Sequence, residues 1–221
     1  MSAKVFVFLG PPGVGKGTQC SLLVERLGVK HVSTGSIIRE EIAAASELGK
    51  QVKDLVQGGG LVEDALLFSC LNAFLHRCDL SSGILLLDGV PRTVSQVTTL
   101  CSVLSGMGLE IAGVISLAAS TDELVIRFSK RWTCACGNVT SLELEAYANT
   151  QACLKCGKVG LFSRREDDQT QVVSRRMEIY RNETEPISEI YRRTGKLREI
   201  SGLRAVELVY VDVAHCLVEM M

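Results

Sequence analysis

The fold is decided by residues 4–18, which read KVFVFLGPPGVGKGT. Residues 5–9 form a continuous apolar run, which is typical of a strand that is covered on both faces. A turn rich in glycine and proline follows, and Leu22, Leu23 and Leu27 then keep helical spacing until Gly28. The stretch therefore predicts a strand, a tight turn and a helix in direct succession.

The turn of this unit has the composition of a phosphate-binding loop. A glycine, four further residues and then Gly15-Lys16 is the Walker A spacing. Glycines let backbone N–H groups approach phosphate oxygens, the helix N-terminus adds its positive dipole end, and Lys16 adds a compact cation. Gly17 stands where serine or threonine is usual, and the hydroxyl follows at Thr18. With both flanking elements predicted, a phosphate site is favoured over a plain turn with a solvated lysine.

Beyond this unit, short apolar runs alternate with segments of helical spacing. An insertion-like segment at 133–162 lacks core periodicity, and a break is expected at 58–60. Alternation of strands and helices predicts an α/β fold, a parallel sheet flanked by helices, with ligands at the carboxyl ends of the strands. Strands are predicted at 29–33, 83–88, 113–117 and 197–200, and helices at 37–55 (capped by Ser36), 62–76, 93–104, 122–131, 166–193 (interrupted near Pro186) and from 203 onward.

Composition narrows the class of protein. The 221 residues carry a formal net charge of -1, and 47% are hydrophobic and 22% charged, which is typical of a soluble globular chain. We expect no nucleic-acid partner, because no basic excess is present, and no membrane partner, because no apolar run is long enough to span a bilayer. The first residues lack the pattern of a signal peptide, so a cytoplasmic monomer is the expectation.

The nine cysteines fall into two groups. Cys134 and Cys136 form one close pair and Cys153 and Cys156 a second, and a glycine follows each pair. Four thiolates in two close pairs suit tetrahedral Zn²⁺, although free thiols and labile disulfides stay open as alternatives. The other five have apolar neighbours and are expected to be small buried side chains: Cys20, Cys70, Cys78, Cys101 and Cys216.

The loop, read as Gly-x-Pro-Gly-x-Gly-Lys-Gly-Thr, resembles that of nucleoside monophosphate kinases, and of the adenylate kinase family above all. The resemblance covers essentially the whole chain. It implies a P-loop core of residues 1–32, 63–129 and 168–221, with a monophosphate-binding arm (33–62) and a lid (130–167) inserted into it. It also implies reversible, Mg²⁺-dependent transfer of the terminal phosphoryl group of ATP to AMP, which gives two ADP.

The resemblance places ATP against the loop and against arginines that flank the insertion. Arg127 and Arg131 lie four apart, which predicts that they share a helix face. In the family, arginines at matching positions stack on the ATP adenine (Arg127) and hold the phosphates (Arg131, Arg165 and Arg176). The residues implied at the ATP site are Gly10, Gly13, Val14, Gly15, Lys16, Gly17, Thr18, Arg127, Arg131 and Gly202.

Two further segments resemble the AMP site of the family. Residues 33–39, STGSIIR, are similar to Ser-Thr-Gly-Asp-x-x-Arg, and residues 88–93, DGVPRT, are similar to Asp-Gly-Phe-Pro-Arg-Thr. The resemblance implies that Gln96 forms hydrogen bonds with the edge of the adenine base and that Asp88 organises Mg²⁺. Val90 replaces the phenylalanine of the family, so an aromatic ring packed on the adenine would be lost. The AMP-binding residues implied are Thr34, Gly35, Arg39, Leu61, Val62, Gly89, Arg92, Gln96, Arg165 and Arg176, and the catalytic ones are Lys16, Arg92, Arg131, Arg165 and Arg176.

The four paired cysteines resemble the zinc-bearing lid of some bacterial adenylate kinases. Those lids carry Cys-x-x-Cys in the first pair, whereas Cys134-x-Cys136 is one residue shorter, so we expect a strained first chelate.

Three other interpretations stay open beside adenylate kinase. A kinase acting on UMP or CMP is disfavoured by Thr34, Gln96 and the long insertion. A non-catalytic nucleotide-binding or zinc-ribbon module, or a purely structural protein, would leave the set of Lys16 and the arginines unexplained.

Overall fold

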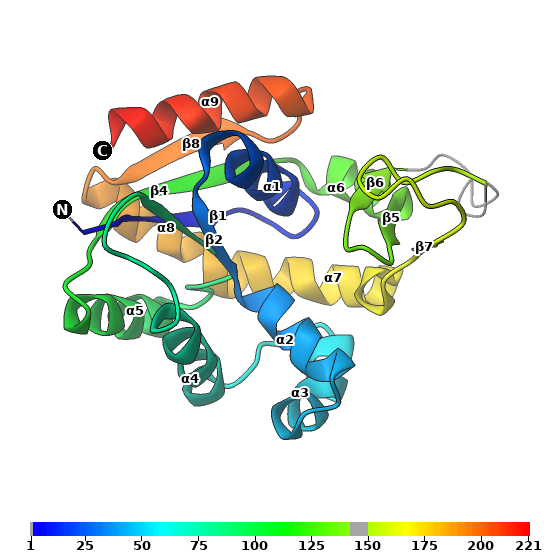
Figure 1. The fold of residues 1–221 in the computed structure, drawn as a ribbon, viewed down its shortest axis with the longest axis horizontal. Helices are drawn as coiled ribbons and strands as arrows, with labels where there is room; N and C mark the ends of the chain where they lie inside the picture. Colours follow the sequence, from blue (N-terminus) through cyan, green and yellow to red (C-terminus); the bar gives the residue numbers. More distant parts are fainter. Residues whose placement is uncertain (1, 142–149) are drawn as a thin grey trace.

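The computed structural model describes residues 2–141 and 150–221. At its centre is a parallel sheet with the strand order β2-β3-β1-β4-β8 (Figure 1). The predicted parallel sheet is therefore confirmed. Its strands are β1 (Lys4–Leu9), β2 (Lys30–Ser33), β3 (Ile84–Asp88), β4 (Ile111–Ala118) and β8 (Leu197–Ser201).

Both faces of the sheet are covered by helices (Figure 1), which explains why its strands are apolar throughout. Successive side chains of a strand point to opposite faces, so Phe6 and Phe8 of β1 pack on one face and Val5 and Val7 on the other. The first face is covered by α1 (Lys16–Leu27), α6 (Thr121–Ser129) and α9 (Val206–Glu219), and the second by α4 (Asp64–Leu75), α5 (Val94–Gly106) and α8 (Glu185–Arg193). Helix α7 (Thr170–Ile179) runs in line with α8 (Figure 1), and its Val173 and Met177 belong to the same apolar cluster as Phe6 and Phe8.

The strand register brings three turns of the chain to one edge of the sheet. Asp88 at the end of β3 pairs with Phe8 of β1 on one side and with Ser33 of β2 on the other. The loop after β1, the start of α2 (Thr34–Ala43) and the turn after β3 therefore lie side by side. This edge is formed by the carboxyl ends of parallel strands, where ligands are expected in such sheets.

The single helix predicted at 37–55 is wrong, since the structure has two helices there, α2 and α3 (Glu47–Gln57). Ala45 takes a positive φ of 48°, which no α-helix contains. Ser46 caps α3 by accepting a hydrogen bond from the N–H of Gly49 at 3.0 Å. The break is not visible in the sequence, because α2 and α3 both bury apolar side chains in the same core and the apolar residues therefore keep helical spacing across it. The predicted N-cap was wrong as well, because the Ser33 hydroxyl caps α2.

The insertion contains a small antiparallel sheet, β6-β5-β7, although irregular structure was predicted there. Its strands are β5 (Arg131–Cys134), β6 (Val139–Ser141) and β7 (Phe162–Ser163). Trp132 and Phe162 pack with Cys134 and Cys153 as its core. Because α6 ends at Ser129 and Arg131 begins β5, the prediction that Arg127 and Arg131 share a helix face is wrong. Part of the insertion, 142–149, is outside the described residues.

The remaining helices follow the sequence closely. The predicted helix 166–193 begins with a short 3-10 turn (Glu166–Asp168), continues as α7 and passes through a π-helical segment (Tyr180–Thr184) into α8, so the interruption near Pro186 is confirmed. The helical prediction for the last segment is confirmed too. Its Val209, Val213 and Leu217 are buried, and this packing outweighs the β-propensity of the segment. Of the five scattered cysteines that were expected to be buried, only Cys20 is; Cys101 is exposed, and the half-buried ones are Cys70, Cys78 and Cys216.

None of the helices in the described part of the chain is long and apolar enough to cross a membrane.

Candidate active site

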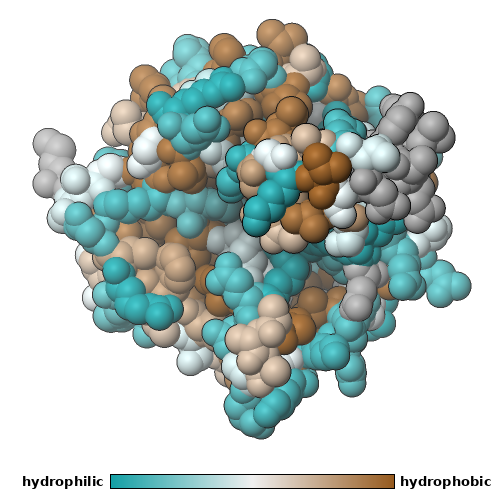
Figure 2. All heavy atoms as spheres, turned by 45° about the vertical axis from the view of Figure 1, so that its right-hand side comes forward, coloured by the Kyte–Doolittle hydropathy of each residue, from teal (hydrophilic) through white to brown (hydrophobic). Residues whose placement is uncertain are grey.

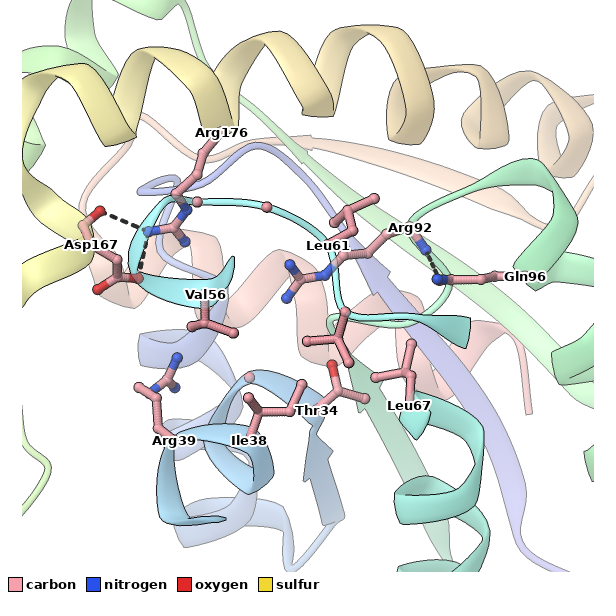
Figure 3. A pocket seen from close by; sticks show the side chains of 14 residues that line it. Thr34, Ile38, Arg39, Val56, Leu61, Leu67, Arg92, Gln96, Asp167 and Arg176 are labelled. Carbon is pink, nitrogen blue, oxygen red and sulfur yellow. Dashed lines mark hydrogen bonds and ion pairs between the residues drawn. The ribbon is translucent and has the colours of Figure 1, made fainter. Parts of the chain in front are cut away.

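Two hollows lie at the carboxyl edge of the sheet. The first, which we call the inner pocket, lies between α2, α3, α4 and the turn after β3 (Figure 3). Apolar side chains such as Ile38, Leu61 and Leu67 line its middle. Figure 3 shows Gln96 at one end and Arg39 and Arg176 at the other. The inner pocket is therefore amphipathic along its length, with an amide at one end and cations at the other.

The second hollow, which we call the outer cleft, follows the loop after β1 and continues to the insertion. It shares Gly35, Arg39, Arg92 and Arg176 with the inner pocket, so the two hollows meet at these residues. Figure 2 shows hydrophilic and hydrophobic residues side by side around the hollow of this face. Every residue predicted at the ATP, AMP or Mg²⁺ sites lines one hollow or both, and only the four paired cysteines lie apart.

The loop after β1 has the shape of a phosphate cradle. Gly10, Gly13 and Gly15 all take positive φ, a conformation that other residues rarely adopt. The Lys16 ammonium folds back over the loop and donates hydrogen bonds to the carbonyls of Gly10 at 2.6 Å and of Pro11 at 3.1 Å. The lysine therefore spans the loop, at the place where phosphate oxygens would give it stronger, charged acceptors.

Gly202 and Arg127 hold the far side of this loop. A Cβ on Gly202 would come within 2.6 Å of the Val14 side chain, so only glycine permits this approach. Arg127 donates a hydrogen bond to the Val14 carbonyl at 3.0 Å. Both predicted ATP-site residues are thus brought to the loop, although Gly202 is far from it in sequence.

Arginines from the insertion and from α7 are held by two adjacent carboxylates. Arg165 forms a two-pronged ion pair with Asp167, at 2.8 and 2.7 Å, and Arg176 donates to the same carboxylate at 2.6 Å. Arg131 pairs in the same way with Asp168, which is buried. Neither aspartate is among the residues predicted at the site from the sequence. In the structure they fix the three arginines at the mouth of the site.

Burial lowers the pKa of several of these cations, and neighbouring cations lower it further. For Lys16, burial is the largest cause and Arg92 and Arg176 add to it, so its pKa falls to about 8 although Asp88 opposes the shift. Burial likewise lowers the pKa of Arg39 and of Arg176 to about 10. All of these groups stay charged at neutral pH. The site therefore carries desolvated positive charge that a polyanion would relieve.

A half-buried carboxylate, that of Asp88, lies at the edge beside the loop. Its oxygen is 3.9 Å from His31 Nε2, and the Cys20 sulfur lies within 4.8 Å of their ligand atoms. Burial raises the pKa of the Cys20 thiol well above its usual value, so the sulfur stays protonated and is a poor ligand. Oxygen suits Mg²⁺, and a single carboxylate at a phosphate site can bind that ion through its waters.

The amide of Gln96 is almost fully buried, with 1% of the residue exposed. Its oxygen accepts a hydrogen bond from the N–H of Arg92 and its nitrogen donates to Asp64, both at 2.6 Å. Thr34, also buried, lines the same pocket. Val90 is buried in the apolar core and is not among the residues that line the inner pocket. The expectation that position 90 faces a base therefore finds no support.

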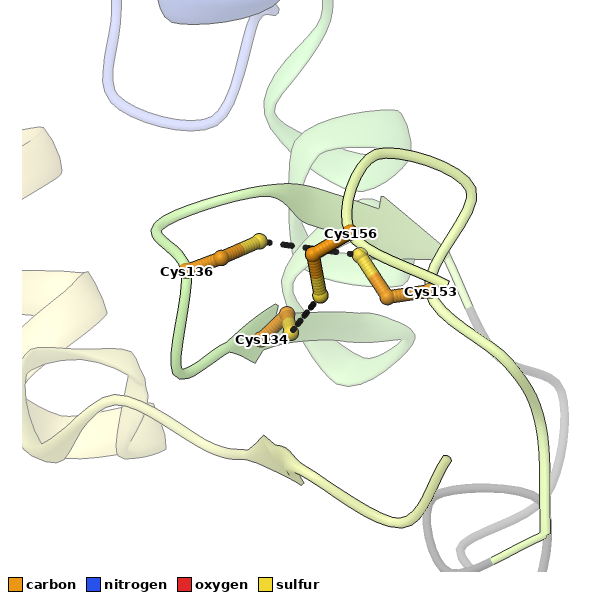
Figure 4. Close-up of side chains that lie close together, drawn as sticks. All are labelled: Cys134, Cys136, Cys153 and Cys156. Carbon is orange, nitrogen blue, oxygen red and sulfur yellow. Dashed lines mark hydrogen bonds between the residues drawn. The ribbon is translucent and has the colours of Figure 1, made fainter. Parts of the chain in front are cut away.

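The four paired cysteines meet in the insertion (Figure 4). All four sulfurs lie within 4.8 Å of one another, with Cys134 and Cys156 3.7 Å apart and Cys136 and Cys153 3.7 Å apart. Sulfurs that share a tetrahedral Zn²⁺, at bonds of about 2.3 Å, are about 3.8 Å apart. The two separations between the pairs are thus close to those of a zinc site, and the four sulfurs form one cluster. Hydrogen bonds from the backbone N–H groups of Cys156 and Lys155 lower the pKa of Cys153 to about 6.

Two contacts of this site had no signal in the sequence. Asp64 is 32 residues from Gln96, and Thr184, whose hydroxyl donates to the Arg92 carbonyl at 2.7 Å, is 92 residues from Arg92. Neither residue belongs to a motif. The sequence also did not predict His31 beside Asp88, because a single histidine in a strand belongs to no motif.

Comparison with known proteins shows that the sequence is similar to those of adenylate kinases. The family model described as adenylate kinase matches residues 8–196. The chain is 40% identical to the adenylate kinase of Thermosipho melanesiensis, over 95% of this chain and 97% of the relative. It is 38% identical to that of Elusimicrobium minutum (95% and 96%) and 36% identical to that of Archaeoglobus fulgidus (94% and 94%). With its phosphate loop, its inner pocket and this similarity along nearly the whole length, the chain belongs to the adenylate kinase family.

Proposed function

We propose that the chain transfers the terminal phosphoryl group of ATP to AMP, with AMP in the inner pocket and ATP along the outer cleft. The observation that carries the proposal is the convergence of cations where the two hollows meet. Lys16 comes from the loop, Arg39 from α2, Arg92 from the turn after β3 and Arg176 from α7. Two phosphate chains that meet end to end would lie among these cations.

The reaction that such a site supports needs no general base, because the attacking group is a phosphate oxygen that is already anionic. The barrier is lowered by positioning the two nucleotides and by stabilising the charge on the oxygens of the group in transfer. Lys16 and Arg92, both next to the meeting point, would act on that charge directly. Arg131, Arg165 and Arg176 would turn from Asp167 and Asp168 toward the phosphates.

Mg²⁺ that binds together with ATP would neutralise part of the phosphate charge. On this proposal Asp88 would hold that ion through water, since its carboxylate lies at the end of β3 beside the loop.

The division into a core, an arm (33–62) and a lid (130–167) is part of the proposal. It is supported by the origin of the cations, since Arg39 belongs to the arm and Arg131 and Arg165 to the lid. Closure of both segments over the core would exclude water, which would otherwise compete with AMP for the phosphoryl group. The monomeric state and the cytoplasmic location stay predictions.

We further propose that the lid holds one structural Zn²⁺ through Cys134, Cys136, Cys153 and Cys156. The sulfur separations support this, and so does the small size of the surrounding core, which consists of few apolar side chains. A segment of this kind gains much of its stability from a cross-link. Four sulfur ligands would leave no position for a reactive water.

Replacing Lys16 by alanine tests the catalytic proposal. Lys16→Ala should lower kcat by about 100-fold or more, because a charge contact made in the transition state is lost. Formation of ADP from ATP, AMP and Mg²⁺ is the measurement. Lys53→Ala, which removes an exposed lysine of α3, is the control and should keep wild-type kcat. A Lys16→Ala enzyme with more than about a third of wild-type kcat would remove Lys16 from the mechanism.

The lowered pKa of Lys16 predicts an alkaline limit to activity. Above pH 8 the free enzyme loses the Lys16 charge, so kcat/KM for ATP should fall there, whereas kcat should fall only at higher pH because bound phosphates favour the charged lysine. In Lys16→Arg the side chain stays charged, and the fall near pH 8 should disappear even if activity is lower. Superimposable pH profiles of the two enzymes would contradict this prediction.

Hydrogen exchange tests the two moving segments. A bisubstrate that joins two adenosines through phosphates should slow amide exchange in the described parts of both 33–62 and 130–167. ATP alone should protect the loop after β1 and the lid, but leave the arm close to its free rate. Protection restricted to the loop after β1 would contradict closure of an arm and a lid.

Elemental analysis tests the zinc proposal. Protein purified without added metal should contain about one Zn per chain, as a single four-cysteine site requires. Removal of the metal with a chelator, or Cys153→Ser, should lower the melting temperature, whereas Cys101→Ser, at an exposed and isolated thiol, should not. Metal-free protein whose four thiols react freely in the native state would rule the site out.

A further inference from the structure

The orientation of the Gln96 amide is fixed by two partners of opposite kind. The N–H of Arg92 can only donate, so it faces the amide oxygen, at 2.6 Å. The Asp64 carboxylate, when ionised, can only accept, so it faces the amide nitrogen, also at 2.6 Å. An amide turned by 180° would set its NH₂ against an N–H and its oxygen against a carboxylate. One orientation is thus held by two hydrogen bonds and the other opposed by two repulsions.

Asp64 is itself held in place. It is the first residue of α4, where the helix dipole favours a carboxylate. Its second oxygen accepts a hydrogen bond from the Ser95 hydroxyl at 3.4 Å, and that hydroxyl lies 2.8 Å from the Thr93 hydroxyl, which caps α5. The carboxylate therefore joins the start of α4 to the start of α5, and Gln96 is fixed relative to both.

We propose that Asp64 is a positioning residue that makes the inner pocket select 6-amino over 6-oxo purine monophosphates. The inference rests on the proposed function, because it places the base of the acceptor against Gln96. With its orientation fixed, the amide has one free acceptor position on its oxygen and one free N–H to offer the base. Adenine presents the complementary edge, an amino donor beside a ring-nitrogen acceptor.

A 6-oxopurine reverses both groups, since it presents a carbonyl acceptor beside a ring N–H donor. A glutamine that was free to turn would satisfy this edge by rotating its terminal amide, at little cost in energy. Gln96 would have to break both of its buried hydrogen bonds to do so, or leave the 6-oxopurine unpaired in a buried site. Discrimination therefore depends on Gln96 together with both of its partners. Without Asp64 the N–H of Arg92 still favours the same orientation, but one of the two hydrogen bonds and one of the two repulsions are lost, so Gln96 should distinguish the two bases less well.

The test compares AMP with IMP, whose bases differ at this edge alone. In the wild type, kcat/KM should strongly favour AMP. Asp64→Asn, whose own amide can turn with Gln96, and Asp64→Ala should lower the AMP-to-IMP ratio at least tenfold, with a gain for IMP. Glu63→Gln is the matched control, because it removes the neighbouring exposed carboxylate at the start of the same helix. Its ratio should equal that of the wild type.

Binding of AMP and IMP by calorimetry gives the same ratio without turnover, and melting temperatures report folding. A purely structural role for Asp64 would lower stability or weaken both nucleotides equally, and an unchanged ratio in both variants would overturn the inference. An equal change in Glu63→Gln would overturn it too, because charge alone would then be the cause. A wild-type enzyme that forms no ADP from ATP and AMP would refute the proposed function, whereas AMP selectivity that survives both substitutions would refute only the role of Asp64.

Discussion

Repulsion among cations at the carboxyl edge of the sheet is the constraint on which the rest of the site depends. Desolvation lowers the pKa of Lys16, Arg39, Arg92 and Arg176, and neighbouring cations lower it further for all of these except Arg92. Such a cluster is costly for the folded chain unless carboxylates or a bound polyanion compensate it. Asp167 supplies compensation in the structure by holding Arg165 and Arg176 together. The same arginines are the groups that phosphates would recruit.

The fold makes this cluster possible because it brings the cations from separate segments on rigid supports. The loop, α2, the turn after β3 and α7 each contribute one group, and no short stretch of chain could place them together. The parallel register between β2, β3 and β1 sets the first three side by side. Helix α7 packs on the sheet through Val173 and Met177, which fixes Arg176 above the edge. Stability and function are thus coupled, because packing of the apolar core holds these cations close together although their mutual repulsion destabilises the folded chain.

The sequence alone predicted most of this arrangement, because the motifs are local and each stands at a strand end. It did not predict where α2 ends, because the break at Ala45 leaves the apolar spacing intact. It predicted a helix at Arg131, because Arg127 and Arg131 keep helical spacing, whereas the residues after α6 pair as a strand with 139–141. The contact between Asp64 and Gln96 could not be predicted, since it joins two helix starts that only the tertiary structure brings together.

In the lid, too, cysteine spacing predicted the kind of site, whereas only the structure shows how the four sulfurs lie. Two cysteine pairs predicted a metal, and the structure brings their four sulfurs into one cluster whose two separations of 3.7 Å suit a tetrahedral zinc site. The strain expected of the shorter first pair stays a prediction. Gly137 and Gly157, which follow the two pairs, both take a positive φ, so the chain turns after each pair. Arg131 and Arg165 flank this cluster in sequence, so a zinc-ordered lid would also order two of the arginines that we propose bind phosphate.

The central claim is that one set of cations serves two nucleotides at once. The most direct measurement is the calorimetric affinity of the wild-type chain for two adenosines joined by five phosphates, compared with ATP alone. Because this ligand spans both hollows, it should bind one per chain, compete with both ATP and AMP, and bind about 100-fold or more tightly than ATP, as expected of a transition-state mimic. An affinity no higher than that of ATP, or competition with only one of the two nucleotides, would contradict the account.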